Sequence, residues 1–325
     1  MYLTEVSNKD EWNRFIFTIP RTPFHQTWEW GELEASRGEA VKRWQWLEGE
    51  HILAQAQMWY HKMPGGFWYA YMPRGPVFAD GLGDDVKHTI ARAFVHEVQK
   101  EYDPIFLLWE PFEAHSMPAE LRCVRNRLPQ HTIFINLEQS EDALRSALHE
   151  KWRYNIGLAQ RKGVEVIFDE RAEFLEHFFS LSEQTTQRNN FPVPPRAHFK
   201  QLFESPVRTI LVTAQFEGRS IASNVLLAAG DTVTYLHGAS GNEFRNLMAP
   251  HLLQWRGMLW AREQGFRQYD VWGVAPEGSA KEQEWTGITR FKRGFGGEMH
   301  VYPEAKKYVY RAIPHVLYSL YRREI

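Results

Sequence analysis

Two cations stand between aromatic residues near the end of this chain, in residues 285–303, which read WTGITRFKRGFGGEMHVYP. Lys292 and Arg293 lie between Phe291 and Phe295, and glycines follow at 294, 296 and 297. Glycine lets the backbone approach a neighbouring group closely, and a fixed cation can stabilise negative charge that develops during a reaction. The alternative is an edge strand whose basic side chains extend into solvent before a glycine turn. This segment alone leaves both interpretations open.

The composition sets the outer limits of the interpretation. A length of 325 residues predicts two compact domains, and 43% hydrophobic residues with 13 tryptophans predict sizeable cores. The net charge of −2 argues against a protein that coats DNA, although a local basic groove remains compatible with it. The single cysteine, Cys123, excludes an internal disulfide and a cysteine-rich zinc site. We expect it to be a small buried apolar residue.

The chain carries no sign of a targeting or membrane-spanning segment. Its start, MYLTEVSNKDEW, lacks the basic stretch and apolar run of a signal peptide. No window approaches the 18 uninterrupted apolar residues expected of a transmembrane helix. We therefore expect a soluble, cytoplasmic protein.

The same order of elements is predicted twice. The first half is expected to contain strands at 43–48, 52–60 and 67–72, a helix at 84–101 and a strand at 105–109. The second half repeats this order with strands at 207–216, 220–228 and 232–238, a helix at 250–264 and a strand at 267–272. Three antiparallel strands, a helix and a strand form the core order of the acyl-CoA N-acetyltransferase (GNAT) fold. The predicted fold class is α/β, with two tandem GNAT-like domains and mixed, largely antiparallel sheets.

The predicted domain boundary follows the first repeat. We expect a first domain at 1–138 and a second domain at 139–307 that carries the reaction centre. A single helix is expected at 140–162, with Trp152 on its apolar stripe and either solvent or an anionic partner at its basic face. A C-terminal helix at 308–325, broken near Pro314, is expected to pack on the first domain. Attachment of that helix to an anionic membrane surface is the alternative.

Neither repeat offers the glycine-rich turn that holds the pyrophosphate of coenzyme A at a helix N-terminus. In the second repeat the corresponding stretch reads RNLMAP, and its Pro250 has no N–H to donate. In the first repeat the stretch reads GLGDD, and two aspartates there would repel a pyrophosphate. The sequence therefore predicts no coenzyme A and no other cofactor, and it predicts no metal site.

The chain resembles the FemABX peptidyltransferases, which add amino acids from aminoacyl-tRNA to peptidoglycan precursors. The matching segments occur in the family's order and span nearly the whole chain: TWEWGELEASRG, YMPRGPVF, KWRYNIGLAQRKGVEV, TTQRNNFP, YLHGASGNEFR and GITRFKRGFGG. Some members carry a long helical hairpin in the second domain, and no stretch here has that length. The resemblance is therefore to the compact, FemX-like type without this arm.

The resemblance implies that Phe291 and Lys292 lie at the reaction centre. The implied reaction is aminolysis, in which an amine of the stem peptide attacks the aminoacyl ester and the tRNA 3′ end leaves. Lys292 would supply positive charge where the oxyanion and leaving group develop. The backbone carbonyl of Phe291 would orient the amine, and no general base is assigned.

The resemblance also implies a set of substrate-binding residues: Arg74 and Arg37 for phosphate, Glu110 for the amine or stem peptide, Tyr235 and His237 for the precursor, Arg188 at the substrate rim and Arg293 for tRNA phosphates. Each has a structural alternative. Glu110 could instead cap a turn, His237 could be a satisfied core residue, and Arg293 could face solvent. The sequence departs from the family near Trp30, where relatives have a phosphate-contacting lysine and this chain has Glu32.

The expected function is transfer of an amino acid from aminoacyl-tRNA to a stem-peptide amine of UDP-MurNAc-pentapeptide or lipid II, which forms an interpeptide bridge. The first alternative is an acyl-CoA-dependent N-acyltransferase with an atypical site. The second is a non-catalytic twin-GNAT binding protein. The sequence leaves open the amino acid transferred, the choice between the two acceptors and the oligomeric state.

Overall fold

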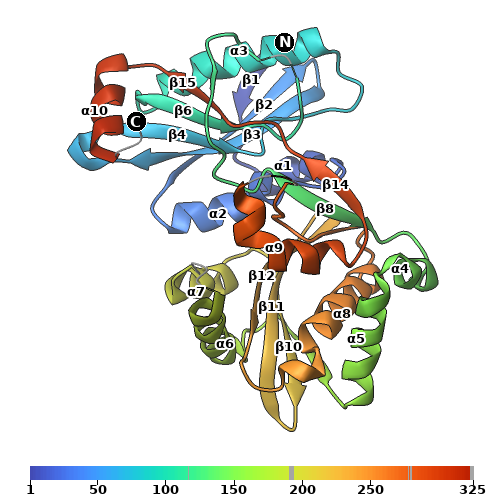
Figure 1. The fold of residues 1–325 in the computed structure, drawn as a ribbon. Coiled ribbons are helices and arrows are strands. Elements are labelled where there is room, and N and C mark those ends of the chain that lie inside the picture. Colours follow the sequence, from blue (N-terminus) through green and yellow to red (C-terminus); the bar gives the residue numbers. More distant parts are fainter. Residues whose placement is uncertain (116, 190–193, 277, 279, 323–325) are drawn as a thin grey trace. The chain divides into compact units, whose positions relative to one another are not determined.

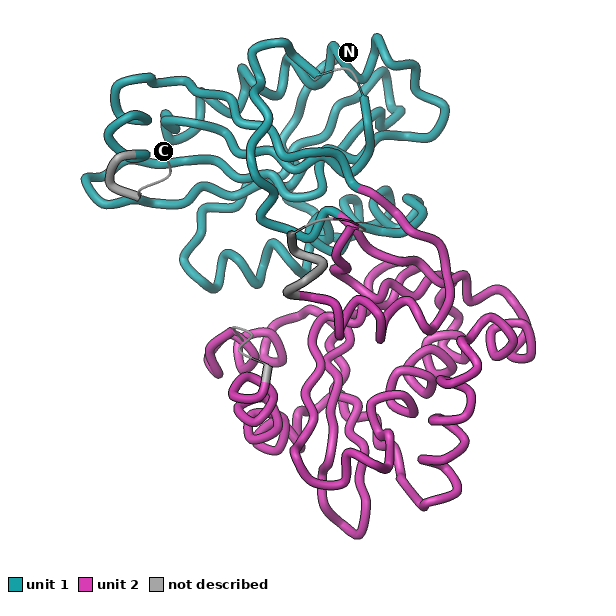
Figure 2. The backbone as a smooth tube through the Cα atoms, viewed as in Figure 1, with its two compact units in different colours: residues 1–130, 302–325 teal, residues 131–301 magenta. Residues whose placement is uncertain are grey.

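The chain divides into two compact units, residues 1–130 with 302–325 (unit 1) and residues 131–301 (unit 2) (Figure 2). The structure is a computed structural model that describes residues 1–115, 117–189, 194–276, 278 and 280–322. The first boundary lies at 130/131 rather than at 138, because residues 131–136 pair with strands of unit 2. The second lies at 301/302 rather than at 307, because residues 306–309 pair with strands of unit 1.

Unit 1 is built on one mixed sheet with the strand order β1-β2-β3-β4-β6-β15-β7, and β5 pairs with β3 (Figure 1). Its strands are β1 (Tyr2–Glu5), β2 (Ala40–Glu48), β3 (His51–Lys62), β4 (Trp68–Pro73), β5 (Val77–Phe78), β6 (Phe106–Glu110), β7 (Arg122–Cys123) and β15 (Lys306–Val309). Its helices are α1 (Lys9–Ile16), η1 (Phe24–Gln26), α2 (Trp28–Ser36), η2 (Pro64–Gly66), α3 (Asp84–Lys100) and α10 (Ala312–Arg322). Within the described part of this sheet only β4 and β6 run parallel.

The core of unit 1 forms where α3 covers the sheet. The predicted apolar stripe of this helix, Ile90, Phe94 and Val98, is fully buried. The ring of Phe94 lies 6.3 Å from that of Trp44 on β2. Burial of each such side chain contributes about 1.5–3 kcal/mol, which fixes the helix on the sheet.

Two predictions for unit 1 were wrong. Residues 308 and 309, the predicted start of the C-terminal helix, belong to strand β15, and the helix begins only at Ala312. Pro314 therefore lies in its first turn, where a missing N–H breaks no helical hydrogen bond. Cys123 is exposed instead of buried, because it lies in the two-residue strand β7 at the sheet edge, with Lys306 Nζ 2.9 Å from its Sγ.

Unit 2 is built on a second mixed sheet with the strand order β14-β8-β13-β12-β11-β10-β9. Its strands are β8 (His131–Asn136), β9 (Glu165–Asp169), β10 (Thr209–Phe216), β11 (Arg219–Ala229), β12 (Thr232–Ser240), β13 (Gln268–Asp270) and β14 (Glu298–Val301). Its helices are α4 (Glu141–Ala147), α5 (Glu150–Arg161), α6 (Leu175–Asn189), α7 (Arg196–Glu204), η3 (Arg245–Leu247), α8 (Ala249–Glu263) and α9 (Ala280–Arg293). Both sheets are mixed and largely antiparallel, which confirms the predicted fold class.

The parallel pair β12 and β13 positions the candidate site. These strands pair only from Thr232 to Thr234 and from Gln268 to Asp270. Strand β12 continues past the pairing into Tyr235, whereas β13 ends at Asp270 and is followed by a loop that contains Gly273. Both of these residues lie beside Lys292 of α9, as described below.

The predicted single helix at 140–162 was wrong, because it is divided into α4 and α5. Leu148 adopts an extended conformation (φ −65°, ψ 143°), and His149 starts α5 by accepting the Lys151 N–H at Nδ1, 3.1 Å away. The edge-strand alternative for Lys292 and Arg293 was also wrong, since both residues belong to the last turn of α9. The glycines at 294, 296 and 297 end this helix.

The part of the chain that the structure describes contains no helix with the length and apolarity needed to cross a membrane. In the same residues, no three His, Cys, Asp or Glu side chains gather in a group that could hold a metal ion.

Candidate functional site

Lys292 is buried inside unit 2, with only 4% of its surface exposed. Its Nζ donates a hydrogen bond to the Gly273 carbonyl, 2.8 Å away, and lies 5.4 Å from the ring centre of Tyr235. Thr289, one turn earlier on α9, accepts the Ala275 N–H at 3.0 Å. The loop after β13 is thereby tied to the helix face that carries the ammonium group.

The electrostatic state of Lys292 is set by its burial. Desolvation lowers the pKa of Lys292 to about 7, and the nearby Asp270 carboxylate opposes this shift. Asp270 is itself held by the hydroxyl of Thr132 and by the Trp272 N–H, 2.8 Å away. Lys292 therefore changes its charge near neutral pH, which is unusual for a lysine and typical of groups that act in a reaction.

Replacing Lys292 with methionine is expected to stabilise the folded chain at about pH 6. The folded-state pKa of about 7 lies below the ordinary 10.5, so between these values the unfolded chain binds more protons. The cost of the buried charge is complete below pH 7 and disappears as the pH rises towards 10.5. Urea unfolding of both proteins should show a larger gain at about pH 6 than at about pH 9. The same gain at both pH values would contradict a charged, buried Lys292.

The carbonyl of Phe291 lies one residue before this lysine. It accepts a hydrogen bond from the indole Nε1 of Trp152 on α5, at 3.0 Å. The Phe291 ring packs at 5.2 Å against both His251 and Phe295. The carbonyl is thus held by Trp152, which the sequence places on the apolar stripe of its helix.

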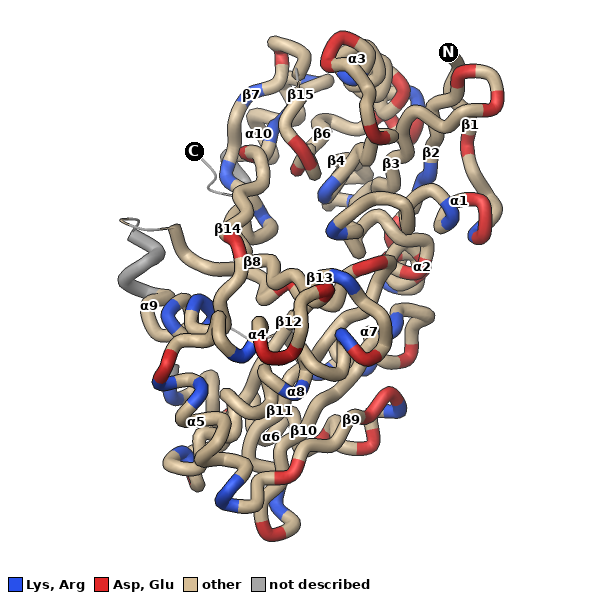
Figure 3. Tube along the Cα trace, turned by 90° about the vertical axis from the view of Figure 1, so that its right-hand side faces the viewer, with Lys and Arg blue, Asp and Glu red and all other residues tan. Residues whose placement is uncertain are grey.

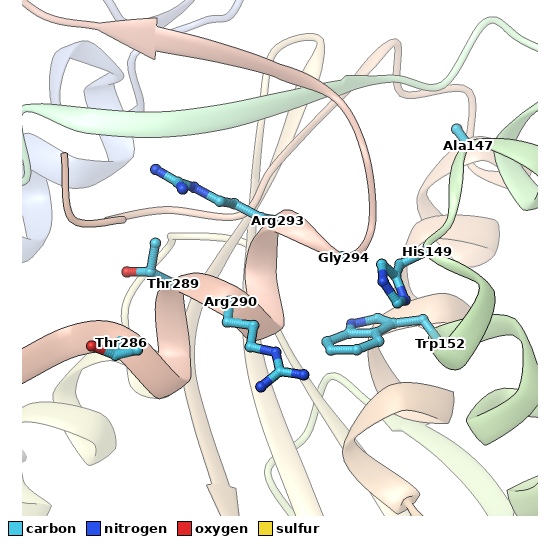
Figure 4. A pocket seen from close by; sticks show the side chains of 8 residues that line it. All are labelled: Ala147, His149, Trp152, Thr286, Thr289, Arg290, Arg293 and Gly294. Atoms are coloured by element: carbon cyan, nitrogen blue, oxygen red, sulfur yellow. The ribbon is translucent and has the colours of Figure 1, made fainter. Parts of the chain in front are cut away.

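A cavity of about 520 Å³ lies between α5 and the end of α9. Its lining is Ala147, His149, Trp152, Thr286, Thr289, Arg290, Arg293 and Gly294 (Figure 4). Figure 4 shows Arg290 extending towards the indole of Trp152 and Arg293 extending away from it. No carboxylate is among these described lining residues, so the cavity is suited to an anionic group. Lysines and arginines also gather along α5 and the end of α9 (Figure 3).

Two further predicted residues of unit 2 lie near Lys292. Burial raises the pKa of Tyr235, whose ring faces the ammonium group. Burial lowers the pKa of His237 to about 3, with smaller contributions from His198 and Lys292. Its ring packs at 5.0 Å against Phe199. His237 is therefore neutral at pH 7. In this form one ring nitrogen donates a hydrogen bond and the other accepts one.

Arg188 lies on α6 and is tied to the end of β12. Its guanidinium donates to the Ser240 carbonyl at 3.2 Å, to Ser240 Oγ at 3.0 Å and to Asn242 Oδ1 at 2.6 Å. Burial, together with the charge of Arg245, lowers the pKa of Arg188. The structure thus shows Arg188 holding a loop.

The remaining predicted residues belong to unit 1. Arg74 is 1% exposed, stacks at 3.5 Å on the Tyr302 ring and donates to the Pro129 carbonyl at 2.6 Å. Glu110 is fully buried and accepts the Arg127 and Leu128 backbone N–H groups at 2.8 and 3.0 Å. It also accepts the hydroxyl of Tyr71. These contacts correspond to the turn-capping interpretation of Glu110.

Arginines pair with Glu32 and Glu34, two acidic residues of α2. Arg37 pairs with Glu34 at 2.9 Å at the end of α2. Arg43 on β2 pairs with Glu32 at 2.9 Å and stacks at 3.7 Å on Trp28. The sequence analysis missed Arg43, whose position in a strand gave no sign of this contact.

The sequence analysis also missed Trp152 and His149 as parts of the site. Trp152 fits the apolar stripe of its helix, and helical periodicity reports only that a residue is buried. The hydrogen-bonding indole N–H leaves no trace in that pattern.

Comparisons with known proteins identify a family and related sequences. The model of the FemAB family matches residues 114–216 and 211–310, which is more than half of the chain. The lipid II:glycine glycyltransferase of Staphylococcus epidermidis is 35% identical over 88 residues, which cover 27% of this chain and 21% of that protein. The enzyme of the same name from Staphylococcus aureus is 38% identical over 80 residues, or 25% and 19% of the two chains. The matched part of this chain thus spans about a fifth of the length of these curated relatives.

Two solved structures share the fold. The crystal structure of FemX matches with a TM-score of 0.84 and 16% identity, covering 98% of this chain and 99% of that one. A tandem GNAT protein from the clavulanic acid biosynthesis pathway matches with a TM-score of 0.51 and 12% identity, covering 94% and 97%. Since the family model matches most of the chain, including the Phe291–Lys292 segment, this chain belongs to the FemAB family.

Proposed function

We propose that this chain transfers an amino acid from aminoacyl-tRNA to the stem-peptide amine of a peptidoglycan precursor, which forms an interpeptide bridge. The names of its staphylococcal relatives support lipid II as the acceptor and glycine as the first amino acid to test. Because aminoacyl-tRNA is the donor, we place the reaction in the cytoplasm. UDP-MurNAc-pentapeptide is the second acceptor to test.

The observation that carries the proposal is the buried ammonium of Lys292, one residue after Phe291, whose carbonyl is held by the Trp152 indole N–H. In the proposed reaction the stem-peptide nitrogen bonds to the aminoacyl carbonyl carbon, and the ester bond to the ribose oxygen breaks. The amine loses a proton, and the ribose oxygen gains one. Lys292 donates one hydrogen bond to Gly273 and keeps two N–H groups for the developing negative charge. The Phe291 carbonyl accepts a hydrogen bond from the attacking amine.

The cavity beside α9 supports a donor that carries phosphates. Arg290, Arg293 and His149 line it, and its described lining contains no carboxylate to repel an anion. We place phosphates of the tRNA acceptor end there. The arginines can form charge-assisted hydrogen bonds with such groups.

The start of α8 supports a donor other than acyl-CoA. In the GNAT fold the corresponding helix N-terminus faces the pyrophosphate. Here Pro250 removes one N–H from the first turn, and the His251 ring packs at 5.0 Å against Trp152 and at 5.2 Å against Phe291. The residues at this helix start thus pack against aromatic rings, and the proposal includes no cofactor.

A transfer assay tests the proposal. Purified protein is mixed with lipid II or UDP-MurNAc-pentapeptide and with tRNA charged with radiolabelled glycine, alanine or serine, and Lys292→Ala is the control. Label that enters the precursor with the wild type and is lost with the control would support the proposal and identify the amino acid. Failure of every pairing, together with tight acetyl-CoA binding, would favour an acyl-CoA-dependent enzyme. Precursor or tRNA binding without transfer would favour a non-catalytic binding protein.

We further propose that α10 contacts the anionic surface of the cytoplasmic membrane. Ile313, Val316 and Leu317 share one face of this helix and are 77%, 54% and 61% exposed. His315 and Tyr318 pack instead on Phe106 of β6, at 5.5 and 5.6 Å. An exposed apolar stripe on a helix is typical of attachment to a membrane surface.

The double variant Ile313→Asp, Leu317→Asp is expected to abolish sedimentation with phosphatidylglycerol vesicles, because it places two like charges in the apolar face. Phe17→Asp is the matched control, since Phe17 is 45% exposed in the same unit but lies at the end of α1. Equal sedimentation of wild type and double variant would contradict membrane contact through α10.

A further inference from the structure

We propose that Trp152 is a positioning residue for the transfer reaction, which holds the Phe291 carbonyl in place for the attacking amine. This inference rests on the proposed function. It concerns the helix α5, which contributes no group to the proposed bond-making and bond-breaking steps.

The carbonyls at the end of α9 differ in their hydrogen-bond partners. The last four carbonyls of a helix lack intrahelical donors and need other partners. Backbone N–H groups of the following turn reach three of the four: Gly294 to Arg290 at 3.2 Å, Phe295 to Lys292 at 3.2 Å and Gly296 to Arg293 at 3.1 Å. The Phe291 carbonyl is omitted from this series and instead accepts the Trp152 indole N–H at 3.0 Å. A carbonyl oxygen has two lone pairs, so one remains for a substrate amine.

The start of α5 holds this turn at two points. Besides the indole bond, the His149 N–H donates to the Gly294 carbonyl at 2.9 Å. His149 and Trp152 belong to the same first turn of α5, since the Trp152 N–H donates to the His149 carbonyl at 2.9 Å. The start of α5 therefore binds the chain on both sides of Lys292, at residues 291 and 294.

The indole of Trp152 fits closely against the backbone of the turn. A Cβ atom built on Gly294 would lie 2.4 Å from the Trp152 ring, so a side chain there would displace the indole. On another side the His251 ring packs at 5.0 Å, and Asn155 Nδ2 lies 3.2 Å from His251 Nε2. The indole is thus fixed in orientation as well as in place, as a positioning group requires.

The test is to remove the N–H and keep the ring. Trp152→Phe, and a variant with 3-benzothienylalanine at residue 152, in which sulfur replaces the N–H, are compared with the wild type in the transfer assay. We expect kcat to fall about ten- to a hundredfold, because a small displacement of a positioned group has effects of this size. KM for donor and acceptor should stay within about twofold, since the removed N–H bonds to the Phe291 carbonyl and both variants keep an aromatic ring in the cavity wall. The pH at which Lys292 titrates should not change.

Trp260→Phe is the matched control. Trp260 lies on α8 and stacks on Phe168 at 5.6 Å, away from α9, so this variant should keep the wild-type kcat. If Trp152→Phe fails to fold, the benzothienyl variant still tests the inference, because its side chain keeps the shape of the indole.

The outcomes separate the inference from the function on which it rests. A folded benzothienyl variant with the wild-type kcat would overturn the inference and leave the proposed function intact. A fall in kcat that comes with an equal rise in KM or a shifted pH profile would show a general structural role and would also overturn it. A wild-type protein without transfer activity would remove the proposed function itself.

Discussion

Lys292→Ala is expected to lower kcat for amino-acid transfer about a hundred- to a thousandfold, the effect of removing one group that stabilises a developing oxyanion. The loss should be in kcat, with KM changed little, because the ammonium group meets its full negative charge only in the transition state. Steady-state transfer to the labelled precursor measures both constants. Lys307→Ala is the control, since Lys307 also lies near an aromatic ring, 4.9 Å from that of Phe106, but belongs to unit 1.

The pH dependence gives an independent check on the same residue. The protonated form of Lys292 predominates below its pKa of about 7, so kcat/KM should have a limb that falls as the pH rises through this value. In Lys292→Arg this limb should disappear, because guanidinium stays protonated. A falling limb that persists in the arginine variant would assign the titration to another group.

Glu110→Ala is expected to destabilise unit 1 by about 3–9 kcal/mol. The substitution leaves three donors without their acceptor: the Tyr71 hydroxyl and the N–H groups of Arg127 and Leu128. Each unsatisfied buried group costs about 1–3 kcal/mol. Urea unfolding measures the change, and hydrogen exchange at the two amides should locate it.

Glu110→Gln distinguishes this role from substrate binding. Glutamine keeps a carbonyl oxygen for the two backbone N–H groups, and its amide can donate to the Tyr71 oxygen. We expect the glutamine variant to lose only about 1 kcal/mol and to retain transfer activity. A glutamine variant that is as stable as wild type but inactive would instead place Glu110 in substrate binding.

The repeated core of each unit, three strands, a helix and a strand, could be predicted because its signals are local. The alternation in residues 52–60 and the stripe of Ile90, Phe94 and Val98 reflect burial on one face, and β3 and α3 follow them. The break between α4 and α5 could not be predicted, because the apolar stripe continues through Leu148 and Trp152 across it. The break depends on the backbone of Leu148 and the cap at His149, and both are consistent with a continuous helix in sequence.

In the candidate site, too, individual residues could be proposed from the sequence, but the contacts between them could not. Lys292 and Phe291 were proposed from the sequence, because the segment with two cations among aromatics and glycines also resembles a family motif. Their partners were not found, since Gly273 and Trp152 contact them from 19 and 139 residues away in sequence. Glu110 was given two alternative roles, and its three donors became visible only in the structure.

The strand order of unit 1 has a consequence for the synthesis of this protein. Strand β15, near the C-terminus, lies between β6 and β7 in the sheet, although all of unit 2 separates it from them in sequence. A nascent chain emerges from the ribosome N-terminus first, and its domains generally fold as units. Strand β7 lacks its pairing partner β15 until residues 131–301 have been made. Unit 2 can therefore complete its sheet before unit 1 does. Synthesis of β15 is thus the step that allows the sheet of unit 1 to be completed.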